Sequence, residues 1–201
     1  MESGRARAGG RYWSCATRVL HAVIDNFSRR ILAWTIADHL DPMNTCLVLA
    51  RAARNLEDSA QAAVYMDSGI ENINGHVDKL FEGDFLRRII AQIDVSFSNS
   101  MIEAWFRSIK HQWLFLHHLS DLATTHKLVE FYVAEHNQQM PHSAFHGQTP
   151  DEMYLGTGSR VPEELAARRK EAREVRLEHN REVACSACPR GSPAAKQDVA
   201  A

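Results

Sequence analysis

Two apolar runs separated by a short polar break constrain the fold of this chain more than any other feature. The first run, VLHAVID, covers residues 19–25, and the second, RILAWTIAD, covers residues 30–38. Both contain β-branched residues, and the four residues between them have the composition of a turn. This arrangement predicts an antiparallel hairpin. Two later apolar runs, at 61–66 and 87–95, predict further strands.

Helix signals lie between and after these strands. Asp41 followed by Pro42 is typical of a helix start, because Asp caps the free backbone N–H groups and Pro is tolerated in the first turn. Further helices are predicted over 74–81 and 121–136, with a short one after Pro150. Strands that come first and then alternate with helices predict an α/β domain.

The two ends of the chain differ in composition from its middle. Residues 1–11 are rich in Gly and Arg, and we expect them to be disordered. Residues 161–182 are rich in Arg and Glu with little apolar periodicity, which fits a solvated helix or a tail. The expected organisation is a disordered or replaced N-terminus, a core domain, and a charged C-terminal helix and tail, at 1–18, 19–157 and 158–201 respectively.

Composition excludes several classes of protein. The chain has 201 residues, of which 45% are apolar, and this is enough for a sizeable core. A net charge of -2 rules out nucleic-acid binding by bulk charge, so any polyanion would need a local basic face. No run of 18 apolar residues exists, so no membrane-spanning helix is expected. Four cysteines at no framework spacing, with no signal peptide, suggest a reduced, cytoplasmic protein.

The segment FSNSMIEAWFRSIKHQW, residues 97–113, predicts a helix with two distinct faces. Ser98, Asn99 and Ser100 can cap its start. Positions 102, 105, 106, 109 and 113 form an apolar stripe that should face the core. A second face carries one acid and then a series of basic side chains, because these positions lie 4, 7 and 8 residues apart; they are Glu103, Arg107, Lys110 and His111.

A second acid stands at the end of a predicted strand. Asp67 follows the run at 61–66 and precedes a small Ser-Gly pair, a placement that is common at metal and phosphate sites in α/β folds. Asp67 and Glu103 together could share a divalent cation such as Mg²⁺, which prefers oxygen ligands. The simpler alternative is that Glu103 forms a structural i,i+4 pair with Arg107. A plain α/β binding domain, with acids only as caps and ion pairs, therefore stays open.

Four segments in order resemble the catalytic core of DDE transposases and retroviral-type integrases, above all bacterial insertion-sequence transposases. The segments are VIDNFSRRILAW, VYMDSGIEN, FSNSMIEAWFRSIKHQW and PHSAFHGQTPDEMY, and the resemblance covers roughly residues 19–157. It implies a ribonuclease H-like fold, a mixed sheet flanked by helices. It also implies cutting and joining of DNA with two Mg²⁺ or Mn²⁺ ions, which activate the attacking oxygen and stabilise the leaving one.

The resemblance assigns roles to particular residues. Asp67 would be the second catalytic acid and Glu103 the third, both as metal ligands. Arg107, Lys110 and His111 would contact DNA. The implied partners are the DNA of insertion-sequence ends and targets, with a homo-oligomer or an intact transposase as possible protein partners, in the bacterial cytoplasm at the nucleoid.

One element of the family pattern is missing. The first Asp of the family lies on a strand that precedes the hairpin, and its place would be around residues 4–8, which read Gly-Arg-Ala-Arg-Ala. The one acid upstream of Asp25 is Glu2, and Asp25 itself falls where a turn-forming Asp is expected. We therefore expect the first strand to be missing and the enzyme to be catalytically incomplete. The alternative is a non-catalytic DNA-binding or regulatory transposase remnant.

Overall fold

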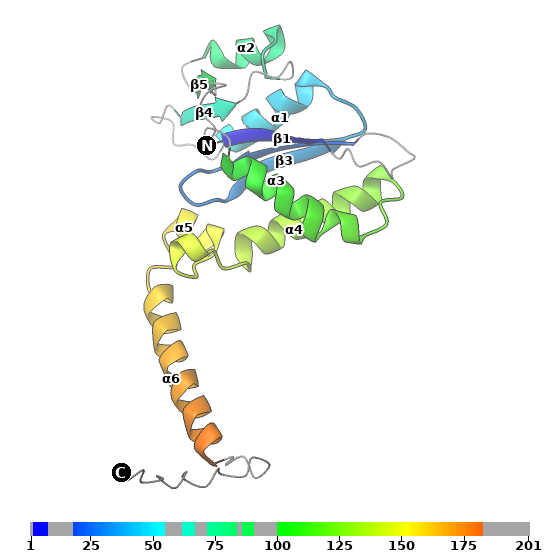
Figure 1. Ribbon diagram of the computed structural model, residues 1–201. Helices are drawn as coiled ribbons and strands as arrows, with labels where there is room; N and C mark the ends of the chain where they lie inside the picture. The colour runs from blue at the N-terminus through cyan, green and yellow to red at the C-terminus, as the bar shows by residue number, and fades with distance from the viewer. Residues whose placement is uncertain are drawn as a thin grey trace, which may run out of the picture. The chain divides into compact units, whose positions relative to one another are not determined.

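The computed structural model describes residues 2–7, 18–54, 62–66, 72–83, 86–90 and 100–182, with the backbone alone described for 2–7. The chain divides into two compact units, Met1–Ser159 and Arg160–Ala201. The first unit contains a sheet with helices on both faces, and the second contains one long helix (Figure 1).

The sheet of the first unit has five strands in the spatial order β3-β2-β1-β4-β5 (Figure 1). β1, β2 and β3 pair antiparallel, whereas β4 pairs in parallel with both β1 and β5. The sheet is therefore mixed, as predicted. The strands cover Glu2–Arg7 (β1), Val19–Ile24 (β2), Ile31–Ala37 (β3), Ala62–Met66 (β4) and Leu86–Ile90 (β5).

The expectation of a missing first strand is wrong, and so is the expectation of disorder for residues 2–7. Glu2–Arg7 form β1 at the centre of the sheet, paired along its whole length with β2 from Glu2–Ile24 to Arg7–Val19. On its other side β1 meets β4, with Glu2 level with Tyr65. The sequence ESGRAR has no apolar alternation. What makes it a strand is its pairing with β2, where its backbone N–H and C=O groups find partners along its whole length, together with the contact of Glu2 with β4.

The β2–β3 hairpin turns where the sequence predicted, and Asp25 holds the turn. The Ser28 backbone N–H and hydroxyl both donate to Asp25 Oδ2, at 2.9 and 2.6 Å. Ser28 is fully buried, so these bonds satisfy polar groups that water cannot reach. The predicted turn role of Asp25 is confirmed.

Helices cover the two faces of the sheet. On one face, Val23 and Ala33 pack with α1 (Pro42–Ala53) and α2 (Gly75–Phe81). Asp41 caps α1 by accepting the Met43 N–H at 2.9 Å, as expected. On the other face, side chains of β2 and β3 pack with α3 (Ser100–Gln112) and α4 (Leu122–Gln138). Two short 3₁₀ helices, Leu114–Leu116 and Ser143–Phe145, and the short α5 (Pro150–Leu155) complete the unit.

Two polar contacts fasten the C-terminal half of this unit to the hairpin. The buried Asn137 amide, near the end of α4, pairs with both backbone groups of Ile31 at the start of β3. Arg30 pairs with Asp151 in α5, with Nε 2.5 Å from Oδ1, and its guanidinium lies over the Tyr154 ring. These contacts fix α4 and α5 against the hairpin.

The second unit carries α6 (Val161–Glu182), whose described side chains are almost all exposed. Of the two possibilities for this segment, the structure shows the helix. In the described part of the chain, no helix is long and apolar enough to cross a membrane.

Candidate functional site

The residues that α3 buries are nearly those that the sequence predicted. Its buried side chains are Ile102, Trp105, Phe106 and Ile109. Trp113, expected on the same stripe, is half-buried and follows the last helical residue, and its ring stacks on Phe131 at 5.3 Å between centroids. The buried stripe fixes the rotation of the helix, so the side chains on its other faces have defined directions.

Glu103 is exposed in the first turn of α3. The partial positive charge at a helix N-terminus favours an anion there. Among the described residues, the carboxylate forms no hydrogen bond or ion pair, and Arg107 one turn later does not bind it. The simpler reading, a structural Glu103–Arg107 pair, is therefore absent, and the carboxylate is available for a ligand.

The basic side chains follow Glu103 along the same side. Arg107 and His111 are exposed, and Lys110 is half-buried. Phe115, just beyond the helix, contacts two of them: Lys110 Nζ lies 5.3 Å from the centre of its ring, and the His111 ring meets it edge-on at 5.1 Å. A cation over an aromatic face is held more firmly than one on a free surface. The stripe is thus a partly ordered basic surface.

Asp67, the proposed second acid, lies outside the described residues, so its separation from Glu103 stays a prediction. The strand before it, β4, ends at the buried Met66. Within the described part of the chain, no group of three or more His, Cys, Asp or Glu side chains could hold a metal ion. Glu103 is the one described member of the proposed metal-binding pair.

The stretch 4–8, where the resemblance places a first acid, can be followed along the backbone as far as residue 7. Gly4 lies directly opposite Ala22, whose side chain belongs to the cluster that packs against α3. Glu2 is level with Tyr65, and β1 runs parallel to β4. Position 4 therefore lies on the α3 side of the sheet, two residues further along than the Tyr65 level. Glycine supplies no ligand there.

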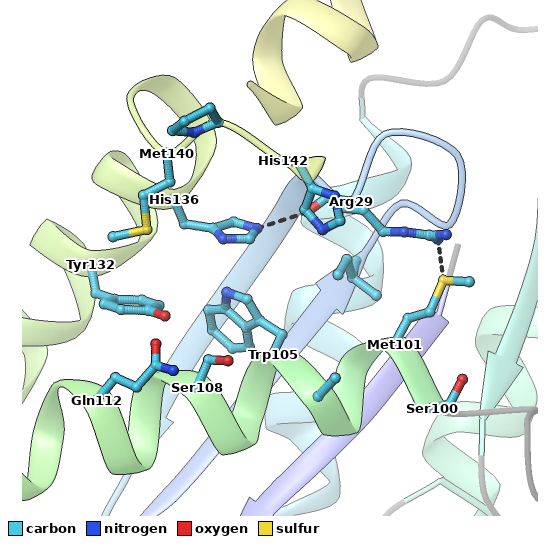
Figure 2. Close-up of a pocket in the computed structure, with 13 residues that line it drawn as sticks. Arg29, Ser100, Met101, Trp105, Ser108, Gln112, Tyr132, His136, Met140 and His142 are labelled. Atoms are coloured by element: carbon cyan, nitrogen blue, oxygen red, sulfur yellow. Dashed lines mark hydrogen bonds between the residues drawn. The ribbon is translucent and has the colours of Figure 1, made fainter. Parts of the chain in front are cut away.

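A cavity of about 430 Å³ borders a third face of α3, and the sequence did not reveal it (Figure 2). It lies between α3, the C-terminal part of α4, the segment after α4, and the hairpin turn. Trp105, which the sequence places in the core, is both buried and part of the cavity wall. The lining residues are Ile24, Arg29, Ser100, Met101, Ala104, Trp105, Ser108, Gln112, Tyr132, His136, Met140, Pro141 and His142.

Two histidines in this cavity have lowered pKa values, which favours their neutral form. His136 Nε2 lies 2.9 Å from the Arg29 carbonyl oxygen, which can only accept, so Nε2 carries the proton. Burial lowers the pKa of His136, and the neighbouring His142 lowers it further. Burial and the charge of Arg29 lower the pKa of His142 as well. Arg29 has a left-handed backbone, with φ of 64°.

The sequence and the fold of this chain are both similar to those of integrase cores. Residues 92–150 match the family model of the integrase core domain. No curated protein matches the sequence. The matched segment contains all of α3 and α4, and so the exposed face with Glu103 and most of the cavity wall, whereas Ile24 and Arg29 lie outside it.

Solved structures of retroviral integrases share the fold at low sequence identity. The catalytic core domain of BIV integrase is 13% identical with a TM-score of 0.58, over 78% of this chain and 93% of that one. The HTLV-2 integrase catalytic core domain in complex with magnesium is 14% identical with a TM-score of 0.56, over 76% and 92%.

A larger assembly gives the same result. The simian T-cell lymphotropic virus intasome, in complex with the PP2A regulatory subunit B56 gamma, is 13% identical with a TM-score of 0.61. The match covers 76% of this chain and 52% of the intasome chain, so this chain spans about half of that protein. Together the matches confirm the predicted ribonuclease H-like integrase-core fold.

Proposed function

We propose that this chain, which has the fold of an integrase catalytic core, is a transposase- or integrase-type core that binds DNA through the exposed face of α3. The observation that carries the proposal is the side of α3 that bears Glu103, Arg107 and Lys110, turned away from the core. Lys and Arg side chains along one helix face suit a phosphate backbone, which positions a protein on DNA without reading its sequence. The integrase-core match over residues 92–150 supports this use of the helix.

The proposed metal ligands are Asp67 and Glu103, with Mg²⁺ or Mn²⁺ as the ion. The exposed Glu103 carboxylate, with no partner among described side chains, fits a hard cation that takes oxygen ligands. In a complete site two such ions would activate the attacking oxygen and stabilise the leaving oxygen of a DNA strand. That the HTLV-2 core was solved with magnesium supports the choice of ion.

We further propose that the chain binds DNA without cutting it. Position 4, on the α3 side of the central strand, is a glycine, and no acid occurs at residues 4–8. Asp25 already holds the hairpin turn through two hydrogen bonds from Ser28 to its Oδ2, which favours a structural role over a catalytic one. The same absence favours the second candidate function, a regulatory remnant that pairs with an intact transposase or competes with it for DNA.

DNA binding by the α3 face is tested by fluorescence anisotropy of a labelled duplex at several salt concentrations. The double variant Arg107→Ala/Lys110→Ala should weaken binding to all sequences alike. It should also lower the slope of log affinity against log salt by about one to two. The reason is that a complex with fewer phosphate contacts releases fewer counterions from the DNA when it forms.

The matched control removes the same charge elsewhere. Arg169→Ala/Lys170→Ala takes two exposed basic side chains from α6. If the α3 variant lowers the salt slope and the α6 variant does not, the proposed surface is supported. Equal losses in both variants would show that charge alone, and not the α3 face, governs binding, and the proposal would fail.

A further inference from the structure

The indole N–H of Trp105 is a buried donor without an acceptor. The side chain is 4% exposed, and Nε1 has no hydrogen-bond partner among the residues that the structure describes. Its nearest ring neighbours are Phe106, Tyr132 and His136, at 5.3 to 6.3 Å between centroids. An aromatic face is a weak partner for an N–H compared with an oxygen. A buried indole N–H usually has an acceptor, so this one points to a missing oxygen.

The orphan donor borders the α3–α4 cavity. Figure 2 shows the Trp105 indole among the cavity residues, with its nitrogen turned toward the His136 side. The volume of about 430 Å³ lies within the range of small-molecule pockets, roughly 300 to 1,000 Å³. The donor therefore belongs to the wall of a cavity of ligand size.

The charge of the described cavity wall favours an anion. Among the described residues that line it there is no Asp or Glu, and Arg29 contributes a positive charge. The Arg29 guanidinium binds the Asn26 carbonyl and the Met101 sulfur through one of its nitrogens, which holds its charge at the cavity. Ser108, Gln112 and the Tyr132 hydroxyl can add further donors to an acceptor oxygen.

The walls favour a flat, apolar body on the ligand. Trp105, Tyr132 and His136 present aromatic rings, and the Tyr132 and His136 rings are nearly parallel at 6.5 Å. Met101 and Met140 add flexible thioether side chains, which adapt to aromatic ligands. Inorganic phosphate would leave these apolar walls unused.

We propose that the α3–α4 cavity binds a planar organic anion, an aromatic ring that carries one carboxylate. A carboxylate oxygen accepts the Trp105 indole N–H, and the ring lies between Tyr132, His136 and the two methionines. This site is separate from the proposed DNA-binding face. Its residues Ala104 and Ser108 each stand one position after a residue of that face, Glu103 and Arg107 respectively. One position along a helix turns the side chain to another side of α3.

The first test uses 2-naphthoate as the probe and naphthalene-2-carboxamide as its uncharged counterpart. Binding to the full chain is followed by two-dimensional ¹H–¹⁵N NMR of the tryptophan indole N–H signals. Naphthoate should shift the Trp105 signal downfield and bind at least about tenfold more tightly than the amide, because hydrogen bonds to a charged group are stronger. Equal affinities, or an unmoved Trp105 signal at saturation, would overturn the proposal.

Three variants separate the donor from the shape of the cavity. Trp105→Phe keeps an aromatic ring and should weaken naphthoate binding about tenfold or more. Ser108→Met keeps the indole and fills the cavity, so it should abolish binding while the Trp105 signal persists in a folded chain. Trp113→Phe is the matched control, because its indole N–H already donates to the Leu128 carbonyl at 2.9 Å.

The outcomes are decisive in both directions. Weaker binding in the Trp105 and Ser108 variants, with unchanged affinity in the Trp113 variant, supports the site. If Trp105→Phe does not fold, Ser108→Met decides the question alone. Naphthoate binding of wild-type strength in Ser108→Met would place the probe elsewhere and end the proposal. DNA affinity is not a readout here, so failure of this site leaves the proposed function untouched.

Discussion

Asn137 acts as a strand partner for Ile31. Its Oδ1 accepts the Ile31 N–H at 2.9 Å and its Nδ2 donates to the Ile31 carbonyl at 3.0 Å, so one side chain satisfies both backbone groups. The pair joins the end of α4 to the first residue of β3. Asn137 is 7% exposed, and water cannot replace it without a change in structure.

The first prediction concerns this contact. Asn137→Leu should lower the free energy of unfolding by about 2–4 kcal/mol, because it leaves two buried backbone groups unpaired. Urea denaturation measures the change. Gln138→Ala, at the exposed neighbouring position, is the control and should change stability by less than about 0.5 kcal/mol. An Asn137→Leu variant as stable as the wild type would mean that Ile31 finds other partners.

The second prediction concerns pH and His136. Burial lowers its pKa in the folded protein, so the unfolded chain binds the proton more readily. Stability is then fully present above the ordinary histidine pKa of about 6.5 and falls as the pH drops below it toward the folded value. The loss from one histidine is at most about 1.4 kcal/mol per pH unit.

The measurement is the free energy of unfolding by urea between pH 7.5 and 5. His136→Gln keeps a donor for the Arg29 carbonyl but does not titrate, so it should flatten the pH dependence. His118→Gln, at an exposed position, should not. Identical pH slopes in wild type and His136→Gln would show that this histidine does not govern acid stability.

The third prediction restores the missing acid. The wild-type chain should not nick a supercoiled plasmid with Mg²⁺ or Mn²⁺. Gly4→Asp places a carboxylate on the α3 side of the central strand and should give metal-dependent nicking. Adding Glu103→Ala to Gly4→Asp should remove that activity again. Wild-type nicking that is lost in Asp25→Ala would instead make Asp25 the first acid.

The fourth prediction concerns Arg30 and Asp151. Their side chains are 26% and 20% exposed, so solvent screens this ion pair only partly. A double-mutant cycle with Arg30→Ala and Asp151→Ala should give a coupling of about 1 kcal/mol. Tyr154→Leu removes the ring beneath Arg30 and should lower the coupling. A coupling near zero would show that the packing of α5 does not depend on the ion pair.

Local patterns predicted most of the elements. The hairpin, the Asp41 cap and the buried stripe of α3 follow from residues close in sequence, and the structure confirms them. The run at 87–95 begins as β5 at 86–90, and its remainder lies outside the described residues. Such features could be predicted because their periodicity and caps are local properties.

What the sequence did not reveal depends on distant residues. β1 became a strand because β2 and β4 lie on either side of it, and nothing in ESGRAR indicates those neighbours. Asn137 appears as an ordinary polar residue until Ile31 is placed against it. The cavity is likewise formed by segments from four parts of the chain, so Trp105 could be assigned only to the core.

The central position of β1 also sets an order for folding. β2 and β3 are joined by a short turn and can pair at once, whereas Glu2 and Tyr65 meet only after a long stretch of chain has been closed into a loop. Closing that loop lowers the conformational entropy of the chain before any stabilising contact has formed. Residues 2–7 are therefore among the last to gain both neighbours, and refolding should wait on this step.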